Sequence, residues 1–159
     1  MNPTYNTIYF DMDGTLVDLY NFPNWENLLT KYNTLPYRKS ESLLTKNIYN
    51  FLNIWIKNGG KISIISYLSK NSCKKYDNAV RQAKKRWLKK NFPFPLEKIH
   101  ILKYDTPKYY KKNIIDDILI DDDEKNIKEW KNNGGVAFLP EQFNNIIRKG
   151  IMNNEYLRF

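Results

Sequence analysis

The sequence predicts an α/β protein with a doubly wound, mainly parallel sheet of five strands. Short apolar segments alternate along the chain with amphipathic segments of helical periodicity, the order expected when crossover helices join parallel strands. The apolar segments are continuous rather than alternating, as in strands that are covered on both faces. With 159 residues, the chain is long enough for one domain with its own core, so we expect residues 1–159 to form a single unit.

Five apolar runs are the predicted strands, and three of them lead directly into polar residues. The first ends at Asp11, the second at Ser66 and the fourth at Asp121. Because parallel strands bring their carboxyl ends to one edge of a sheet, we expect these three ends to be neighbours. The predicted strands are Thr7–Phe10, Lys61–Ile65, Lys98–Leu102, Asp117–Ile120 and Val136–Leu139.

Four segments with apolar residues three and four positions apart are the predicted helices. Glycines follow the first and third of them, and a Pro-rich stretch follows the second, which are signals that end a helix. The segment Asp18–Lys39, rich in Asn, Pro and aromatic residues, has no such period and is expected to be irregular. We interpret residues of about 18–45 as a small insertion. The predicted helices are Ser40–Lys57, Ser72–Asn91, Glu124–Asn133 and Glu141–Lys149.

The composition excludes several classes of protein. One His and one Cys cannot form an internal disulfide or a structural zinc site, so any chemistry must come from carboxylates, hydroxyls or lysines. No apolar run approaches the ~18 residues of a membrane span. The first residues, Met-Asn-Pro-Thr-Tyr-Asn, lack the pattern of a secretory signal, so a cytoplasmic protein without a membrane partner is expected.

The formal net charge of +9 has two interpretations. It would suit a polyanionic partner such as a nucleic acid, or it reflects a general bias of this sequence toward Lys. The basic residues are densest in Lys84–Lys90 and Lys108–Lys112, whereas the acidic residues gather after the predicted strands. A nucleic-acid partner is therefore possible on this basis but not established.

The acidic residues after the strands are of the types that bind a metal ion. Asp11 and Asp13 are followed by Gly14, which permits a tight turn, and Asp121 and Asp122 follow the fourth strand. Carboxylates gathered at one point repel one another unless a cation neutralises them. Oxygen ligands of this kind favour Mg²⁺, so the sequence predicts a magnesium site at this edge.

These residues carry a resemblance to a known family. The segment Ile8–Asp18 (Ile-Tyr-Phe-Asp-Met-Asp-Gly-Thr-Leu-Val-Asp) resembles the first motif of the haloacid dehalogenase-like (HAD) phosphohydrolases. Ser66 resembles their second motif, and Ile118–Asp122 their fourth. The resemblance implies a Rossmann-like sheet with a cap inserted after the first strand, and a phosphatase that uses Mg²⁺.

The resemblance also implies roles for individual residues. Asp11 would attack the phosphate and form an aspartyl-phosphate, while Asp13 would exchange a proton with the leaving group and with water. The ion would be held by Asp11, the backbone carbonyl of Asp13 and Asp122, with Asp121 behind them. The hydroxyl of Ser66 would bind a phosphate oxygen.

The family also uses a Lys that pairs with the nucleophile and the phosphate, and two neighbouring lysines compete for this role. Lys84 and Lys85 point about 100° apart on a helix, so only one of them can face the site. The segment Lys84–Pro93 is similar to the 5′(3′)-deoxyribonucleotidase branch, in which the Lys stands three residues before a Trp. With Trp87 in that place, the similarity selects Lys84.

The substrate prediction depends on the predicted insertion. Its aromatic residues Tyr20, Phe22 and Trp25 either stack on a nucleobase or form the insertion's own small core. The similarity to deoxyribonucleotidases favours a nucleoside monophosphate. Because the insertion is shorter than in that branch and the chain is basic, the alternative is a polynucleotide 3′-phosphatase. A second alternative, a binding module without turnover, is disfavoured because the residues of all four motifs are present.

Overall fold

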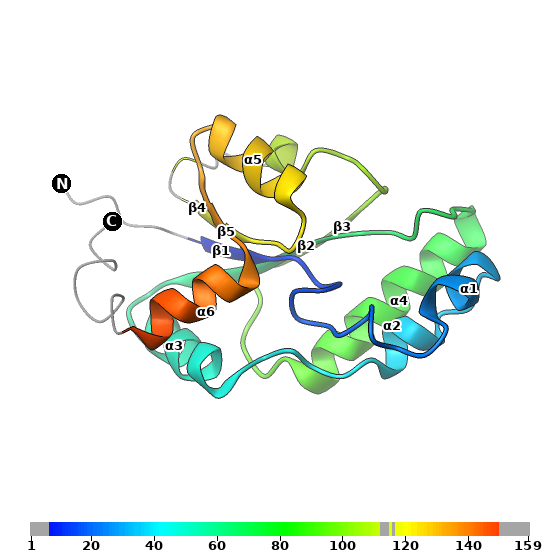
Figure 1. The fold of residues 1–159 in the computed structure, drawn as a ribbon, viewed down its shortest axis with the longest axis horizontal. Helices are drawn as coiled ribbons and strands as arrows, with labels where there is room; N and C mark the ends of the chain where they lie inside the picture. The colour runs from blue at the N-terminus through cyan, green and yellow to red at the C-terminus, as the bar shows by residue number, and fades with distance from the viewer. Residues whose placement is uncertain (1–6, 112–114, 116, 150–159) are drawn as a thin grey trace.

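The computed structural model describes residues 7–111, 115 and 117–149. The interpretation of Met1–Asn6 as lacking a signal therefore lies outside the described residues, as does the basic Lys112. The chain forms one sheet with helices on both of its faces (Figure 1).

All five predicted strands are present, and all of them are parallel. They are β1 (Thr7–Phe10), β2 (Lys61–Tyr67), β3 (Lys98–Leu102), β4 (Asp117–Ile120) and β5 (Val136–Phe138), in the spatial order β3-β2-β1-β4-β5. The end of β1, Phe10, lies between Ile64 and Ile120 of its two neighbours. The predicted doubly wound parallel sheet is confirmed, and its central strands end side by side.

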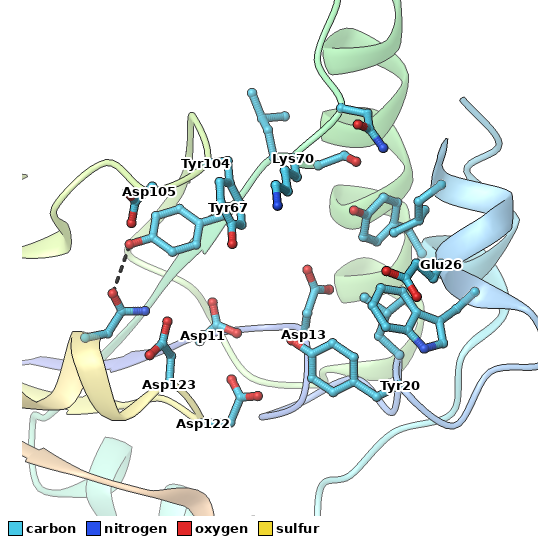
Figure 2. A pocket seen from close by; sticks show the side chains of 18 of the residues that line it. Asp11, Asp13, Tyr20, Glu26, Tyr67, Lys70, Tyr104, Asp105, Asp122 and Asp123 are labelled. Atoms are coloured by element: carbon cyan, nitrogen blue, oxygen red, sulfur yellow. Dashed lines mark hydrogen bonds between the residues drawn. The ribbon is translucent and has the colours of Figure 1, made fainter. Parts of the chain in front are cut away.

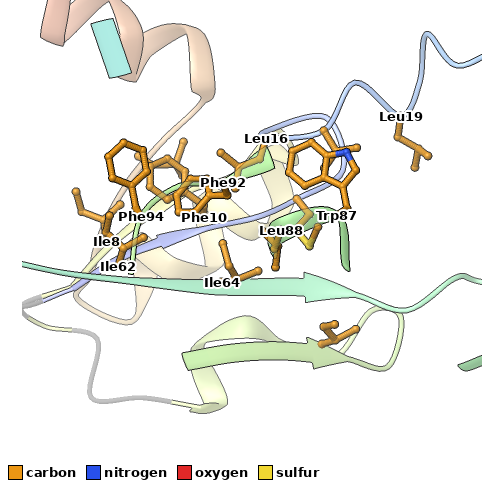
Figure 3. Close-up of a cluster of buried hydrophobic side chains, with 14 of the residues drawn as sticks. Ile8, Phe10, Leu16, Leu19, Ile62, Ile64, Trp87, Leu88, Phe92 and Phe94 are labelled. Atoms are coloured by element: carbon orange, nitrogen blue, oxygen red, sulfur yellow. The ribbon is translucent and has the colours of Figure 1, made fainter. Parts of the chain in front are cut away.

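One face of the sheet is covered by α3 (Lys46–Lys57), α4 (Lys74–Asn91) and α6 (Pro140–Arg148). Phe10 and Ile64 point to this side and are buried with Trp87 of α4, as Figure 3 shows. The other face packs against α5 (Glu124–Asn132), where Tyr9 meets Trp130 with ring centroids 5.7 Å apart. Burial of both faces is the reason why the strands carry apolar residues at consecutive positions.

Two helices begin later than the sequence predicted. The helix expected from Ser40 begins at Lys46, where the side chain of Thr45 accepts a hydrogen bond from the amide of Ile48. The residues before it pair instead with the loop after β1: Leu43 N donates to Leu16 O at 2.8 Å. The helix expected from Ser72 begins at Lys74, after an extended Cys73.

The segment predicted to be irregular contains two short helices, α1 (Trp25–Thr30) and α2 (Leu35–Lys39). Asn24 and Tyr32 have positive φ angles of 58° and 57°, and these turns bound α1 on both sides. α2 packs against α4, and Trp87 Nε1 donates a hydrogen bond of 2.8 Å to the carbonyl of Ser40. The function of residues 18–45 as a cap stays a prediction. Among the described residues, no helix is both long and apolar enough to span a membrane.

Candidate active site

A tight turn after β1 fixes the first two carboxylates. The amide of Asp11 donates to the carbonyl of Ile120 at 2.9 Å, which ties the end of β1 to the end of β4. The carbonyl of Met12 then accepts hydrogen bonds of 2.8–3.2 Å from the amides of residues 15–17. Because Met12 is itself buried, this turn holds Asp11 and Asp13 at the carboxyl edge of the sheet.

Gly14 allows Asp122 to approach this turn. Its φ is +78°, and a Cβ atom at this position would lie 2.2 Å from Asp122 Oδ2 and 2.6 Å from Tyr20 Cε2. No side chain larger than hydrogen fits without displacing the Asp122 carboxylate. Gly14 is therefore required both by its left-handed backbone conformation and by the space that Asp122 occupies.

Three carboxylates meet at this edge. Asp11, Asp121 and Asp122 each offer an oxygen, and these atoms all lie within 4.8 Å of one another. Asp11 and Asp121 are buried, whereas Asp122 is half-buried and opens on the same pocket as Asp13 (Figure 2). Carboxylates brought this close raise one another's free energy unless cations compensate them.

Lys108, at the start of the 3-10 helix η1 (Lys108–Lys111), compensates two of these carboxylates. Its Nζ lies 2.7 Å from Asp11 Oδ1 and 2.6 Å from Asp121 Oδ2, and it sits 4.6 Å from the centre of the Tyr67 ring. Burial alone would lower the pKa of Lys108, but the two carboxylates outweigh it and raise the pKa well above the ordinary value. Lys108 therefore remains a cation at neutral pH.

Asp121 is held on both of its oxygens. Oδ2 accepts from Lys108 and from Asn126 Nδ2 at 3.1 Å, while Oδ1 accepts from the amide of Asp123 at 2.9 Å. The Tyr67 hydroxyl lies 3.0 Å from Asn126 Oδ1 and fixes that amide in turn. Asp121 thus has little capacity left for a further ligand, whereas Asp122 is half-buried and lines the pocket.

Lys84 makes a separate cluster with Asp13. Its fully buried Nζ lies 2.6 Å from Asp13 Oδ2, 3.0 Å from Ser66 Oγ and 2.7 Å from the carbonyl of Tyr67. Of the two lysines that the sequence left in competition, Lys84 is the one that faces the site, and Lys85 is exposed to solvent.

The remaining acidic groups hold their protons more tightly than usual. Burial raises the pKa of the Asp122 carboxyl to about 7, and the Asp11 and Asp121 carboxylates add to the rise. Burial also raises the pKa of Asp13, although Lys84 opposes it. The second oxygen of Asp13, Oδ1, is buried without a hydrogen-bond partner in the described structure. Asp13 therefore has one oxygen fixed by Lys84 and one free to exchange a proton.

A pocket of about 620 Å³ opens above these groups. Tyr20 and Trp25, two of the three aromatic residues expected to bind substrate, line it, but Phe22 is not among its lining residues. Ser66 and Lys84 do not line it either; they are fully buried, and Lys84 contacts Asp13. Tyr67, Tyr104 and Lys70 face Tyr20 and Glu26 across the cavity (Figure 2).

The structure differs from the sequence-based expectation in which lysine pairs with Asp11. Lys84 was expected to do so, but its carboxylate partner is Asp13, and Lys108 is the residue that pairs with Asp11. Lys108 lies in one of the two dense basic stretches, where nothing in the local pattern separates it from its neighbours. The only usable signal is its position between a predicted strand and Asp121.

The donor set fits a divalent cation. Four carboxylates, those of Asp11, Asp13, Asp121 and Asp122, face two ammonium groups, so a negative excess remains when all are ionised. Burial raises the pKa of Asp122, and the neighbouring carboxylates of Asp11 and Asp121 raise it further. All side-chain donors are oxygens, which suits a hard ion such as Mg²⁺. The residues present could therefore hold such an ion at Asp11 and Asp122.

No protein-family model and no curated protein sequence matches this chain. Solved structures do match. A HAD family enzyme of Bacteroides thetaiotaomicron, solved as a magnesium complex, is 13% identical with a TM-score of 0.52, covering 86% of this chain and 93% of that one. D,D-heptose 1,7-bisphosphate phosphatase of Burkholderia thailandensis is 10% identical with a TM-score of 0.50, covering 82% and 74%. At these identities the likeness concerns the fold, and this chain has the Rossmann-like fold of HAD hydrolases.

Proposed function

We propose that the protein is a Mg²⁺-dependent phosphatase that hydrolyses a phosphomonoester through an aspartyl-phosphate on Asp11. The observation that carries the proposal is the convergence of Asp11, Asp13, Asp121 and Asp122 with two buried ammonium groups at one sheet edge. A structural salt-bridge network would not need the negative excess that this arrangement leaves. Phosphoryl transfer needs both a nucleophile and positive charge that offsets the oxygens of the transferring group.

Asp11 is the proposed nucleophile because one of its oxygens is fixed and the other is free. Lys108 holds Oδ1, which leaves Oδ2 to attack phosphorus while the ester P–O bond breaks. Asp13 donates a proton to the leaving oxygen, a role favoured by its raised pKa and its unpartnered Oδ1.

The second half of the proposed reaction returns Asp11 to its starting state. Asp13, now ionised, accepts a proton from a water molecule that attacks the phosphorus. The acyl-phosphate P–O bond breaks, and inorganic phosphate leaves with Asp11 as a carboxylate. Lys84 keeps Asp13 Oδ2 in place through both proton transfers, since its Nζ is fixed by Ser66 and the carbonyl of Tyr67.

The residues that would hold Mg²⁺ are Asp11, Asp122 and the backbone carbonyl of Asp13, with Asp121 orienting Lys108 behind them. When bound, the ion supplies positive charge to the phosphoryl oxygens. Ser66 and Lys84 remain the proposed phosphate contacts. Because both are buried beneath Asp13, a phosphate that they touch would have to sit deep at this edge.

We propose a nucleoside monophosphate as the substrate. The pocket of about 620 Å³ is large enough for a nucleotide, and Tyr20 and Trp25 line one wall of it with their ring centroids 5.2 Å apart. Tyr67 and Tyr104 form a second aromatic pair, 5.8 Å apart, on the opposite wall. A planar base between these walls would stack while its phosphate reaches Asp11.

The test is phosphate release from a panel of ribo- and deoxyribonucleoside 5′- and 3′-monophosphates, with p-nitrophenyl phosphate as a general substrate. We expect release with Mg²⁺, none with EDTA, and none from Asp11→Asn in either condition. The matched control is Glu124→Gln, an exposed carboxylate at the end of the same acidic run and outside the pocket, which should keep its activity. Metal-independent release, or equal activity of Asp11→Asn, would overturn the proposal.

The alternative substrate, a 3′-phosphate at the end of a nucleic acid, is favoured by the density of basic residues on α4. A 3′-phosphorylated oligonucleotide in the same panel separates the two. Its hydrolysis should weaken steeply with salt, through release of counterions, whereas hydrolysis of a mononucleotide should respond mildly.

A further inference from the structure

Helix α4 has a higher density of positively charged residues than the rest of the chain. Eight of its 18 residues are Lys or Arg, out of 26 in the whole protein, and one is Asp. A general compositional bias toward Lys would spread these residues evenly, so it does not account for the concentration. Lys84 belongs to the site, and Arg81 is partly buried with its guanidinium donating to the carbonyl of Ile101. The other six are exposed: Lys74, Lys75, Lys85, Arg86, Lys89 and Lys90.

These six residues occupy one side of α4, which we call the basic face. Within the part of the chain that the structure describes, none of them forms an ion pair. The single acid of the helix, Asp77, accepts a hydrogen bond from Ser72 at 2.8 Å. The basic face therefore has no internal compensation.

Most charges of the basic face do not stabilise α4 itself. Lys74 and Lys75 stand in the first turn, where the helix dipole disfavours a cation, and the N-cap Cys73 makes no side-chain hydrogen bond. Lys85 and Lys89 lie four residues apart, an arrangement in which like charges repel, and so do Arg86 and Lys90. The dipole favours only the residues of the last turn. A bound anion would offset this repulsion and stabilise the helix.

The buried side of α4 faces away from the basic face and packs against α2. Trp87 on that side donates a hydrogen bond to the carbonyl of Ser40, the residue after α2. This contact brings the end of α2 beside the C-terminal half of α4, as Figure 1 also shows. At 1.5 Å per residue, α4 is roughly 27 Å long, which spans several phosphates of a nucleic-acid strand.

We propose that the basic face of α4 binds the phosphodiester backbone of a nucleic acid. A membrane-binding helix would need apolar residues free to insert into lipid, but Val80, Trp87 and Leu88 of α4 are buried in the core. A protein interface would need an apolar or aromatic centre, and between the lysines the face offers only Asn78, Ala79 and Gln82. A purely cationic face without an apolar anchor fits phosphates. The proposal does not depend on the phosphatase activity.

The test compares two variants of the full chain that lose the same charge. The first replaces Lys85, Arg86, Lys89 and Lys90 with Gln. The control replaces four exposed lysines of α3 and α5 with Gln: Lys46, Lys57, Lys128 and Lys131. Binding is measured as the anisotropy of labelled DNA of about 20 nucleotides, single- and double-stranded, between roughly 50 and 200 mM NaCl.

We expect the wild type to bind DNA and the first variant to lose at least tenfold in affinity, with its salt slope reduced by about 3–4. The control should stay within about threefold of the wild type, with its slope unchanged. Equal losses in both variants would mean that net charge alone drives binding. Equal losses would overturn the proposal. It would also be overturned if the wild type bound no DNA, or if it bound phosphatidylserine vesicles in place of DNA.

Circular dichroism separates a lost surface from a lost fold. The four Gln residues retain helix propensity, so both variants should unfold at temperatures close to that of the wild type. Hydrolysis of p-nitrophenyl phosphate, if the wild type performs it, should be unchanged in both, since none of the replaced residues lies in the pocket. A failure of DNA binding with intact hydrolysis, or the reverse, distinguishes this proposal from the proposed enzymatic function.

Discussion

The two buried lysines of the candidate site have the same chemistry but different surroundings. Lys108 lies between two buried carboxylates, Asp11 and Asp121. Lys84 has a single carboxylate partner, Asp13, whose side chain is 17% exposed, and its other two partners are a hydroxyl and a carbonyl. The Lys108 side therefore carries a negative excess that Asp122 increases, whereas the Lys84 side is balanced.

In the proposed mechanism, this difference suits the two sides to separate tasks. The side with the excess, near Asp11 and Asp122, could hold a cation. On the balanced side, Asp13 can gain and lose a proton without a metal ion, because Lys84 stabilises the ionised form while burial favours the protonated one.

Removing each lysine in turn should give the largest contrast. Lys108→Met leaves two buried carboxylates without their cation, and we expect it to lower the free energy of unfolding by about 3–5 kcal/mol at neutral pH with EDTA. Lys84→Met strands one partly exposed carboxylate, and we expect a loss of about 1–3 kcal/mol. Urea unfolding followed by circular dichroism measures both.

The exposed Lys85→Met is the matched control and should leave stability unchanged within about 0.5 kcal/mol. Lowering the pH should partly restore Lys108→Met, because protonation removes the repulsion between Asp11 and Asp121. If Lys84→Met lowers the free energy of unfolding more than Lys108→Met does, the proposed division of charge is wrong.

Two glycines with the same backbone conformation test the role of Asp122. Gly14 and Gly59 have φ angles of +78° and +86°, but only at Gly14 would a Cβ meet Asp122; at Gly59 nothing lies within 4 Å. Both Ala variants should lose about 1–3 kcal/mol of stability through backbone strain. Only Gly14→Ala should also weaken Mg²⁺ binding, by at least tenfold in calorimetric titration. Equal Mg²⁺ affinity in the two variants would show that Asp122 does not bind the ion.

The pH dependence of stability follows from the raised pKa of Asp122. Its carboxyl has a pKa of about 7 in the folded protein against 3.8 when unperturbed, so the unfolded state ionises first as pH rises. Because of this group, the free energy of unfolding in EDTA falls as the pH rises from about 4 to 7. Bound Mg²⁺ takes the place of the proton, so its stabilising effect should be larger near pH 7.5 than near pH 5.5.

Thermal unfolding at both pH values, with and without Mg²⁺, measures this effect. Asp122→Asn should lose the stabilisation by Mg²⁺ and weaken the pH dependence. Part of the pH dependence should remain, because burial also raises the pKa of Asp121 to about 6. Asp123→Asn, which keeps a residue able to cap α5, should behave as the wild type does. A Mg²⁺ effect that is larger at the lower pH would contradict the assignment of Asp122.

The smallest expected effect concerns substrate binding by the segment of residues 18–45. Tyr20→Ala should raise the KM for a nucleoside monophosphate by the equivalent of ~1–3 kcal/mol and leave kcat nearly unchanged, because the tyrosine would contact the base and not the reacting atoms. Tyr32→Ala is the control, since Tyr32 is equally exposed but packs on Tyr76 outside the pocket. Parallel changes in both variants would count against stacking by Tyr20.

The sequence predicted the sheet and the acidic edge because both follow from local patterns. Continuous apolar runs identify the strands, and a parallel sheet then brings Asp11 and Asp121 together without further information. Lys108 could not be found in this way. It is one of several lysines in its stretch, and only the folded loop after β3 shows that it reaches Asp11 across 97 positions of the chain.

The segment of residues 18–45 was the least predictable part. α1 and α2 have six and five residues, too short for a helical period to be recognised, and turns with positive φ at Asn24 and Tyr32 bound α1. Aromatic composition alone could not show that Tyr20 and Trp25 line the pocket while Phe22 does not. Side-chain direction in such segments is set by tertiary contacts.

The most direct test of the proposed mechanism is whether Asp11 becomes phosphorylated during turnover. The protein is mixed with Mg²⁺ and an excess of p-nitrophenyl phosphate, quenched in acid after a fraction of a turnover, and digested for peptide mass spectrometry. We predict the added mass of one phosphoryl group on the peptide that contains Asp11, and its absence in Asp11→Asn. Turnover by the wild type with no phosphorylated peptide, or with the label on another residue, would contradict the account.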